Sequence, residues 1–261
     1  MKFFLHRLAL GLVAILAFAA PGHTDDLGGG GPQHILITYR SEAASRPAFR
    51  TYLTHTEAQM LERLKAQGVL KDYQILFNPF ASTGTWDAML VLDFTSFSAT
   101  ARWQQIERTM PGGLARAGLK LAKPYRTYSC DLFREGAADS PGDVAKRVLY
   151  VIPYSYNAAD QYKSYVDGYV IPQVKGWMKE GVLSRYRIYL NRYNVGEPEP
   201  WDSLFVYDYR DQESFGRRDE IVAKVRGPLR EDPTWKHLND IKATIRSETE
   251  NTITEILAPL K

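Results

Sequence analysis

The chain has 261 residues, of which 44% are hydrophobic and 24% charged, enough apolar material for a sizeable buried core. Its formal net charge is +3, and without Lys2 and Arg7, which lie in a segment expected to be removed, 31 basic residues face 30 acidic ones. This balance argues against nucleic acid as a partner. The single cysteine, Cys130, excludes an internal disulfide, and a buried, inert thiol is its expected state.

The N-terminus has the pattern of a secretory signal peptide over residues 1–20. Basic residues precede an apolar run over 8–20, and Ala17-Phe18-Ala19 offers small residues at a cleavage site. The run is too short to span a membrane, which takes about 20 apolar residues. Residues 21–33, centred on four glycines, are typical of a flexible tether. We therefore expect a periplasmic or secreted protein with no membrane attachment once the signal is removed.

The rest of the chain predicts two similar halves, residues 34–135 and 147–261, joined by a linker over 136–146. Apolar periodicity and turn-forming residues give each half a strand, a helix, two strands, a helical stretch and a last strand. In the first half, strands are expected at 35–39, 72–80, 86–94 and 124–134, and helices at 47–67 and 96–110. In the second half, strands are expected at 148–154, 184–193, 201–209 and 247–259, with helices at 162–180, from 211 and after 235.

The two halves also share sequence. Gln67-Gly68-Val69-Leu70 recurs as Glu180-Gly181-Val182-Leu183 after 113 residues, and Trp86-Asp87 recurs as Trp201-Asp202 after 115. A two-residue insertion at 197–200 reconciles these offsets and indicates a tandem duplication. Each half has the element order of a ferredoxin-like unit, which leaves one sheet face bare. We predict an α+β fold with two tandem ferredoxin-like repeats forming an intramolecular α+β barrel, a monomer with pseudo-twofold symmetry for which further dimerisation stays open.

Over residues 34–260 the chain resembles the dimeric α+β barrel superfamily, and within it NIPSNAP-like and antibiotic-biosynthesis-monooxygenase-like proteins. The resemblance rests on the element order, the duplication and the helix start Asp232-Pro233-Thr234-Trp235. It implies a closed space between two sheets that can hold a ligand. In monooxygenase-like and isomerase-like relatives, tyrosine, tryptophan, asparagine and arginine side chains position a phenolic or dicarbonyl substrate.

Alternation along the strands assigns side chains to the two sheet faces. On the second strand of each half, the residues expected under the helices are Tyr73, Ile75 and Phe77, with Tyr186, Ile188 and Leu190 as counterparts. The alternate residues, expected inside the barrel, include Arg187, Tyr189, Asn191 and Tyr193. On the third strands, Met89, Val91, Leu204 and Val206 are expected under the helices. Those expected inside the barrel are Trp86, Ala88, Leu90, Trp201, Ser203, Phe205 and Tyr207.

The inward-facing residues of the second half are the candidate site for an anionic or phenolic small molecule. Arg187 would hold the anion, Tyr189 or Tyr207 would orient the ligand, and Glu250 would be the general base. Glu250 and Tyr207 are thus the candidate catalytic residues, and the candidate ligand-binding residues are Arg187, Tyr189, Asn191, Tyr193 and Trp201. If the chain is an enzyme, a cofactor-independent oxygenase or isomerase fits this set.

Simpler interpretations stay open. Asn78 and Asn191 recur at equivalent strand ends, which is typical of side chains that cap turns, and Asp87 recurs as Asp202 in the same way. Arg187 and Glu250 could pair with each other across the interior. Large side chains could also fill the barrel and leave a non-catalytic interaction protein.

No metal or cofactor is expected. None of the five histidines has a metal-ligand spacing, and the sequence has no glycine-rich phosphate loop. The resemblance raises haem, because chlorite dismutase-like relatives carry it on a histidine of the C-terminal repeat. His237 is the candidate for that role, so a haem-binding barrel enzyme is an alternative to the cofactor-independent one.

Overall fold

The computed structural model describes residues 33–82, 84–193 and 201–257. The expected signal peptide, and all but the last residue of the expected tether, lie outside these ranges. Within the described ranges, no helix is long and apolar enough to cross a membrane.

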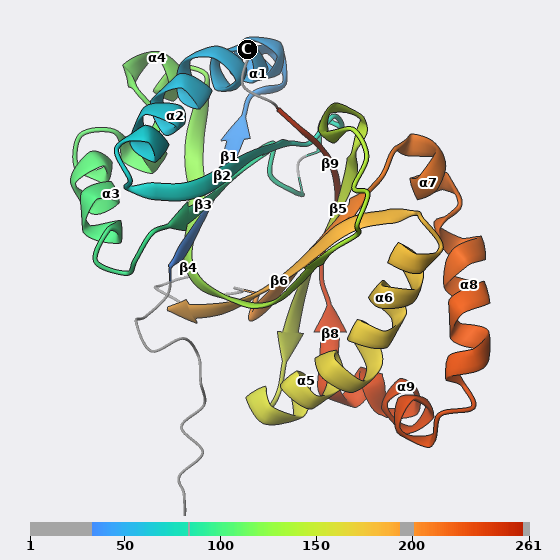
Figure 1. The fold of residues 1–261 in the computed structure, drawn as a ribbon. Helices are drawn as coiled ribbons and strands as arrows, with labels where there is room; N and C mark the ends of the chain where they lie inside the picture. Colours follow the sequence, from blue (N-terminus) through green and yellow to red (C-terminus); the bar gives the residue numbers. More distant parts are fainter. Residues whose placement is uncertain (1–32, 83, 194–200, 258–261) are drawn as a thin grey trace, which may run out of the picture.

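Four strands and the helices between them make up the first half of the described chain (Figure 1). The strands are β1 (His34–Ser41), β2 (Leu70–Phe77), β3 (Ala88–Phe94) and β4 (Ala122–Ala137). Between β1 and β2 the helical segments are η1 (Ala43–Ser45), α1 (Arg46–Tyr52), the π-turn η2 (Leu53–Glu57) and α2 (Ala58–Ala66). Between β3 and β4 they are α3 (Thr100–Glu107), η3 (Pro111–Gly113) and α4 (Arg116–Leu119).

The second half repeats this order with a longer helical stretch before its last strand. After η4 (Val144–Lys146), the strands are β5 (Val148–Tyr156), β6 (Leu183–Tyr193), β7 (Ser203–Tyr209), β8 (Arg246–Glu248) and β9 (Thr252–Ile256). Between β5 and β6 lie α5 (Ala159–Tyr165), the π-turn η5 (Val166–Val170) and α6 (Ile171–Lys179). Between β7 and β8 lie α7 (Gln212–Gly216), α8 (Arg218–Leu229) and α9 (Pro233–Ile245).

The first helical segment of each half ends as the glycine pattern predicts. Gly68 and Gly181 have φ angles of 71° and 76°, the left-handed conformation that a side chain would strain. Each segment also contains a π-turn, and the first residues of the two π-turns, Leu53 and Val166, are 113 residues apart. The expected helices over 47–67 and 162–180 are therefore present, each interrupted at the same place. The expected last strand over 247–259 is present as two short strands, β8 and β9.

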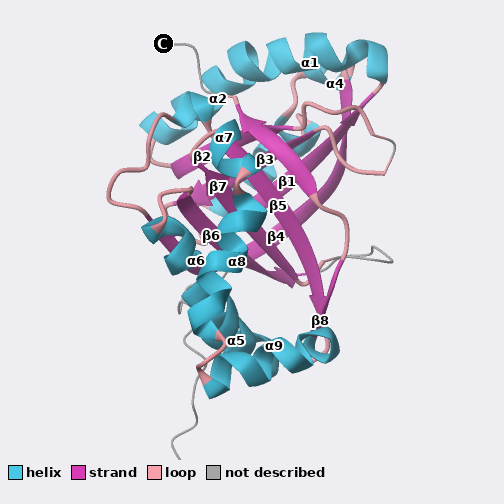
Figure 2. Ribbon diagram, turned by 90° about the vertical axis from the view of Figure 1, so that its right-hand side faces the viewer, coloured by secondary structure: helices cyan, strands magenta, loops and turns pink. Residues whose placement is uncertain are grey.

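All strands join one antiparallel sheet that closes on itself. The order is β7-β6-β4-β1-β3-β2-β9-β5, and β5 pairs in turn with β7, which closes the barrel. The short strand β8 pairs with another part of β5. Closure removes the free edges that would otherwise need protection. The helices lie outside the barrel, α1–α4 over one side and α5–α9 over the other (Figures 1 and 2). The predicted α+β barrel is confirmed.

Three groups of buried side chains hold the barrel and its helices together. One group packs between the helices and sheet of the first half, and includes Phe49, Leu61, Leu90 and Trp103. A second, richer in aromatic rings, packs under the helices of the second half. The third fills the middle of the barrel, largely with the aliphatic side chains Leu36, Leu76, Met89, Val91, Leu149, Val151, Leu204 and Val206. Cys130 lies in this third group and is fully buried, as expected for an inert thiol.

The face assignment of the second strands is confirmed, and that of the third strands is wrong. Ile75, Phe77, Tyr186, Ile188 and Leu190 lie under the helices, with Tyr73 packed at the edge of the same group. Met89, Val91, Leu204 and Val206 lie inside the barrel instead. Ala88, Leu90, Phe205 and Tyr207 lie under the helices.

The error comes from one irregular residue before each third strand. Trp86 and Trp201 do point into the barrel, as predicted, but they precede the regular strands, which begin at Ala88 and Ser203. The irregular residues are Asp87 and Asp202, which lie between each tryptophan and its strand. Their backbone amides donate to the Tyr39 and Tyr154 carbonyls at 2.8 and 2.9 Å. Because one extra residue reverses every later side chain, alternation counted from the tryptophans fails along the whole strand.

Candidate functional site

One end of the barrel contains a cavity of about 550 Å³, which we call the aromatic cavity. Three of its aromatic rings point into the barrel, those of Trp86, Tyr128 and Trp201. Its remaining lining residues are Thr38, Gly84, Thr85, Tyr125, Arg126, Pro153, Ser155, Leu204, Thr249, Glu250 and Thr252. A space of this size, lined by aromatic rings and by several polar side chains, can hold a small molecule.

The rings reach the cavity through two local features of the strands. The irregular residues before β3 and β7 direct Trp86 and Trp201 inward, and alternation along β4 turns Tyr128 the same way. The ring centroids of Tyr128 and Trp201 are 4.3 Å apart at an interplanar angle of 36°. Closely packed rings of this kind hold each other in place and form a rigid aromatic wall for a ligand.

Arg126 supplies the positive charge of the cavity lining. It lies two residues before Tyr128 on β4, next to Tyr125, where the pairing of β4 with β1 slips by one residue. The Tyr125 ring lies between two guanidinium groups, 3.8 Å from that of Arg40 and 4.9 Å from that of Arg126. Burial raises the pKa of the Tyr128 hydroxyl, and the neighbouring Arg126 opposes this rise. Tyr128 is therefore a neutral hydrogen-bonding group beside a cation.

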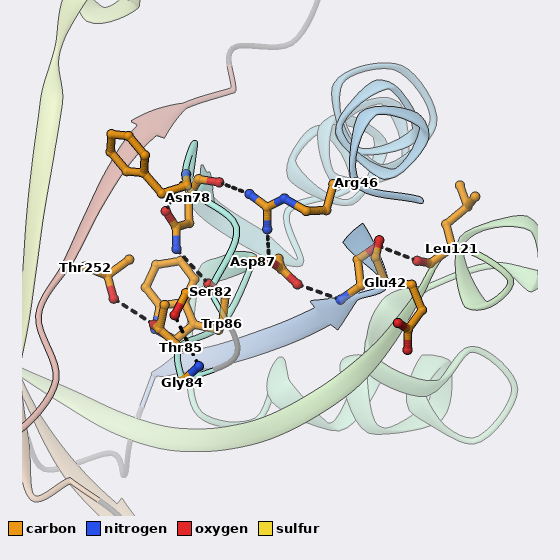
Figure 3. Close-up of polar contacts among 12 residues, drawn as sticks. Glu42, Arg46, Asn78, Ser82, Gly84, Thr85, Trp86, Asp87, Leu121 and Thr252 are labelled. Atoms are coloured by element: carbon orange, nitrogen blue, oxygen red, sulfur yellow. Dashed lines mark hydrogen bonds and ion pairs between the residues drawn. The ribbon is translucent and has the colours of Figure 1, made fainter. Parts of the chain in front are cut away.

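Glu250 supplies the negative charge, from the loop between β8 and β9. A Cβ added to Gly84 would lie 3.2 Å from Glu250 Oε1, so the glycine lets the carboxylate approach the loop before β3. Partial burial raises the pKa of Glu250, against the opposing effects of Arg40 and of a hydrogen bond with Thr85. The Thr85 hydroxyl is also hydrogen-bonded to the Thr252 hydroxyl at 2.9 Å, and Figure 3 shows this pair of threonines. A carboxylate held at a cavity mouth with a raised pKa is suited to accept a proton.

The repeated asparagines and aspartates are structural. Asn78 Nδ2 donates to the Trp86 carbonyl at 3.3 Å, and Asn191 Nδ2 donates to the Trp201 carbonyl at 3.1 Å (Figure 3 shows the first). The Asp87 and Asp202 carboxylates accept from the amides of Ser41 and Tyr156 at 2.7 and 3.0 Å. Asn191, predicted to bind ligand, therefore holds the tryptophan turn in place, and the turn-capping interpretation is confirmed.

The first half adds one ion pair to this framework. Arg46 pairs with Asp87 and donates to the Asn78 carbonyl at 2.5 Å, and both charged side chains are nearly buried (Figure 3). They lie in the wall of another cavity, of about 470 Å³, between the end of β1, the loop before β3 and the start of β4. Because the two charges satisfy each other, we assign this pair to stability rather than to ligand binding.

The predicted site residues do not come together at one place. Trp201 and Glu250 line the aromatic cavity, whereas Arg187 and Tyr189 line a separate cavity of about 310 Å³. Tyr207 faces the helices, 5.6 Å from the Trp177 ring, and its predicted position inside the barrel is wrong because of the irregular residue before β7. Tyr193 ends β6, and its side chain lies outside the described part of the structure.

Arg187 does not pair with Glu250, so that interpretation is also wrong. Its guanidinium is an ion-pair partner of Asp208 at 3.6 Å and donates to the Tyr189 hydroxyl at 3.2 Å and to Gln74. Asp208 was not a candidate because it lies on β7 between Tyr207 and Tyr209, on a strand whose faces were assigned in reverse. Among the residues of the aromatic cavity that were not predicted from the sequence, three lie on β4: Tyr125, Arg126 and Tyr128. Their signal was present, because Arg126, Tyr128 and Cys130 alternate along a strand expected at 124–134.

The surroundings of His237 do not fit haem. His237 is exposed on α9. The space beneath α9 is occupied by stacked rings, with Trp235 4.8 Å from Tyr169 and Tyr169 5.1 Å from Tyr165. A porphyrin would have to displace these buried side chains. In the described ranges, no group of histidine, cysteine and acidic side chains is placed to hold a metal ion.

Comparison with known proteins identifies the fold. No family model and no curated protein sequence matches this chain. An anthrone oxidase-like protein matches at a TM-score of 0.54 and 8% identity, over 86% of this chain and 91% of that one. A candidate monooxygenase from Fusobacterium nucleatum subsp. nucleatum matches at 0.51 and 12%, over 87% and 93%. A mutant chlorite dismutase from Candidatus Nitrospira defluvii matches at 0.50 and 10%, over 88% and 92%.

These proteins all belong to the dimeric α+β barrel superfamily, so the resemblance predicted from the sequence is confirmed at the level of the fold. Identities of 8–12% establish shared architecture and leave the chemistry to the residues of this chain.

Proposed function

We propose that this chain is an exported small-molecule-binding α+β barrel whose ligand, an anionic or phenolic aromatic compound, occupies the aromatic cavity. The observation that carries the proposal is the combination of three inward-pointing rings, one guanidinium and one carboxylate around a space of about 550 Å³. The signal peptide pattern over residues 1–20 supports export.

We also propose that the barrel arose by tandem duplication, so that one chain supplies both sheets. The support is local and repeated. The π-turns begin 113 residues apart, glycines with positive φ end both helical segments, and matching asparagine–tryptophan bonds precede β3 and β7. The two halves differ in the surroundings of these turns: in the first half, Asp87 has an ion-pair partner, Arg46.

In the proposed binding mode, the ligand ring stacks between the aromatic walls and its anionic group meets Arg126. Charge-assisted hydrogen bonds to a guanidinium are shorter and stronger than neutral ones. Glu250 at the mouth then accepts a proton from a phenol or an activated carbon, as the first step of a cofactor-independent isomerisation or oxygenation. The structural neighbours described as an anthrone oxidase-like protein and a candidate monooxygenase are consistent with the oxygenation.

The test of binding is a tryptophan-fluorescence titration with hydroxybenzoates, because Trp86 and Trp201 line the cavity. We expect Arg126→Gln to weaken binding at least tenfold, the typical value of a charged hydrogen bond. The matched control is Arg134→Gln. Arg134 lies on the same strand but does not line the cavity, and its Nε is 2.8 Å from the Asp167 carboxylate. Equal affinities of the Arg126 variant and the wild type would overturn the proposed anion contact.

Catalysis is tested separately from binding. Glu250→Gln should keep ligand affinity within a few-fold but lower any proton-transfer turnover by roughly 10²–10⁴, the usual contribution of a general base. Glu248→Gln is the control, since this neighbouring carboxylate pairs with Arg246 at 3.6 Å and is not part of the cavity lining. If Glu250→Gln turned over a substrate at the wild-type rate, the base would have to be another group.

A further inference from the structure

A cluster of arginines surrounds one buried carboxylate near the start of β5 and β6. Asp208 on β7 is fully buried, with 0% of its surface exposed. Arg147 immediately precedes β5, and Arg185 and Arg187 lie on β6, where Arg185 is the backbone partner of Asp208. Arg147 and Arg187 are themselves only 9% and 4% exposed. The arginine cluster, as we call these four residues, lies apart from the aromatic cavity and shares none of its lining residues.

The single carboxylate does not satisfy its two buried neighbours. Arg147 Nη1 and Arg187 Nη2 each lie 3.6 Å from an Asp208 oxygen, beyond the 2.7–3.2 Å of a normal N–H···O hydrogen bond. Neither Asp208 oxygen, nor Nε of Arg147 or Arg187, has a hydrogen-bond partner among the described residues. Burial raises the pKa of Asp208, and the three arginines oppose that rise.

The charges of the cluster also do not balance. A second carboxylate, Glu135, accepts from Arg185 Nη2 at 3.0 Å and is half exposed. Three guanidinium groups therefore face two carboxylates, and one of those carboxylates is shared between two buried arginines. A buried charge without full compensation is costly, so a further anion would stabilise this arrangement.

Space for such an anion lies beside the cluster. Arg147 and Arg185 line a concavity of about 400 Å³ together with Glu135, Gly136, Ala137 and Pro141. Arg185 and Glu135 also belong to the neighbouring cavity of about 310 Å³ that contains Arg187. The lysines of that second cavity do not need a further anion, because Lys65 pairs with Asp72 at 2.9 Å and Lys71, 3.6 Å from Asp93, has a side chain that is 72% exposed to solvent. In the arginine cluster, the buried donors left without a hydrogen bond among the described residues are Nε of Arg147 and Nε of Arg187.

We propose that Arg147 and Arg185 bind a small oxyanion, with a phosphate or carboxylate group, in this concavity. The planar guanidinium fork matches two oxygens of such an anion. The site is independent of the proposed function, because it shares no residue with the aromatic cavity.

The test is calorimetric titration of the mature full-length protein with inorganic phosphate and with succinate, at an ionic strength fixed with chloride. We expect saturable binding of at least one of the two, and comparison of the two arms shows whether phosphate or carboxylate is preferred. Arg147→Gln and the half-exposed Arg185→Gln should each raise the dissociation constant tenfold or more, and the Arg134→Gln control should leave it unchanged.

A second variant keeps the test decisive if Arg147→Gln fails to fold. Asp208→Asn removes the carboxylate that competes for the guanidinium groups, so phosphate should raise the unfolding temperature of this variant by more than that of the wild type. An equal or smaller rise would overturn the proposal. So would binding that is absent in the wild type, or that survives unchanged in Arg185→Gln.

Discussion

Glu57 is a carboxyl group enclosed in the core between the helices and sheet of the first half. It lies in the π-turn η2, is 1% exposed, and accepts one hydrogen bond, from the Tyr52 hydroxyl at 3.2 Å. Its Oε1 has no partner among the described residues. Burial raises the pKa of Glu57 to about 8, only partly opposed by the bond from Tyr52. The residue is therefore protonated in the folded protein at neutral pH.

This protonation makes stability fall as the pH rises. Between its ordinary pKa of 4.5 and about 8, the unfolded chain has released the Glu57 proton and the folded chain still holds it. The free energy of unfolding therefore decreases across this window, by at most about 5 kcal/mol. Glu57→Gln should abolish that part of the decrease, measured by urea unfolding at pH 5 and pH 8. The exposed Glu42→Gln is the control, and a Glu57→Gln variant with the wild-type pH slope would refute the assignment.

At the scale of elements, the sequence predicts whatever is set by local chemistry. The helix ends at Gly68 and Gly181, the second-strand faces and the inward tryptophans all follow from glycine conformation, alternation and repetition. The third-strand faces do not, because the irregular residues Asp87 and Asp202 are held by bonds to Tyr39 and Tyr154, which are distant in sequence.

The candidate site shows the same division. The sequence predicts Glu250 and Trp201 as site residues, and both line the aromatic cavity, although they are 49 residues apart in the chain. Arg187 and Tyr189 were assigned correctly to the barrel interior but lie in another cavity, since alternation specifies a face and not a position along the barrel axis. Arg126 could not be predicted from the pattern of one half, because it lines the cavity only where β4 lies near Trp86 of the first half and Trp201 of the second.

At the scale of the whole molecule, the barrel is closed by two unequal seams between its halves. β4 and β6 are paired through eight residue pairs, from Ser129 with Tyr193 to Ala137 with Arg185. Among the described residues, β2 and β9 are paired through two, Leu76 with Ile256 and Phe77 with Glu255, and the Leu257 amide just after β9 donates to the Ile75 carbonyl at 2.9 Å. A bidentate ion pair from Arg50 to Glu255, at 2.8 and 3.1 Å, also bridges this seam, but its side chains are 46% and 39% exposed, so it contributes about 1 kcal/mol at most. The second seam is the weaker one.

We therefore expect the barrel to open between β2 and β9, and hydrogen exchange measured by mass spectrometry tests this. Amides of residues 252–257 should exchange faster than those of 129–137, because local opening costs less where fewer pairs must break. This seam also borders the aromatic cavity through Thr252, whose hydroxyl bonds to Thr85. A ligand bound there should slow exchange at 252–257 while leaving 129–137 unchanged, because binding stabilises only the closed barrel. Equal exchange at both seams, with or without ligand, would show that closure is uniform and that the cavity does not depend on it.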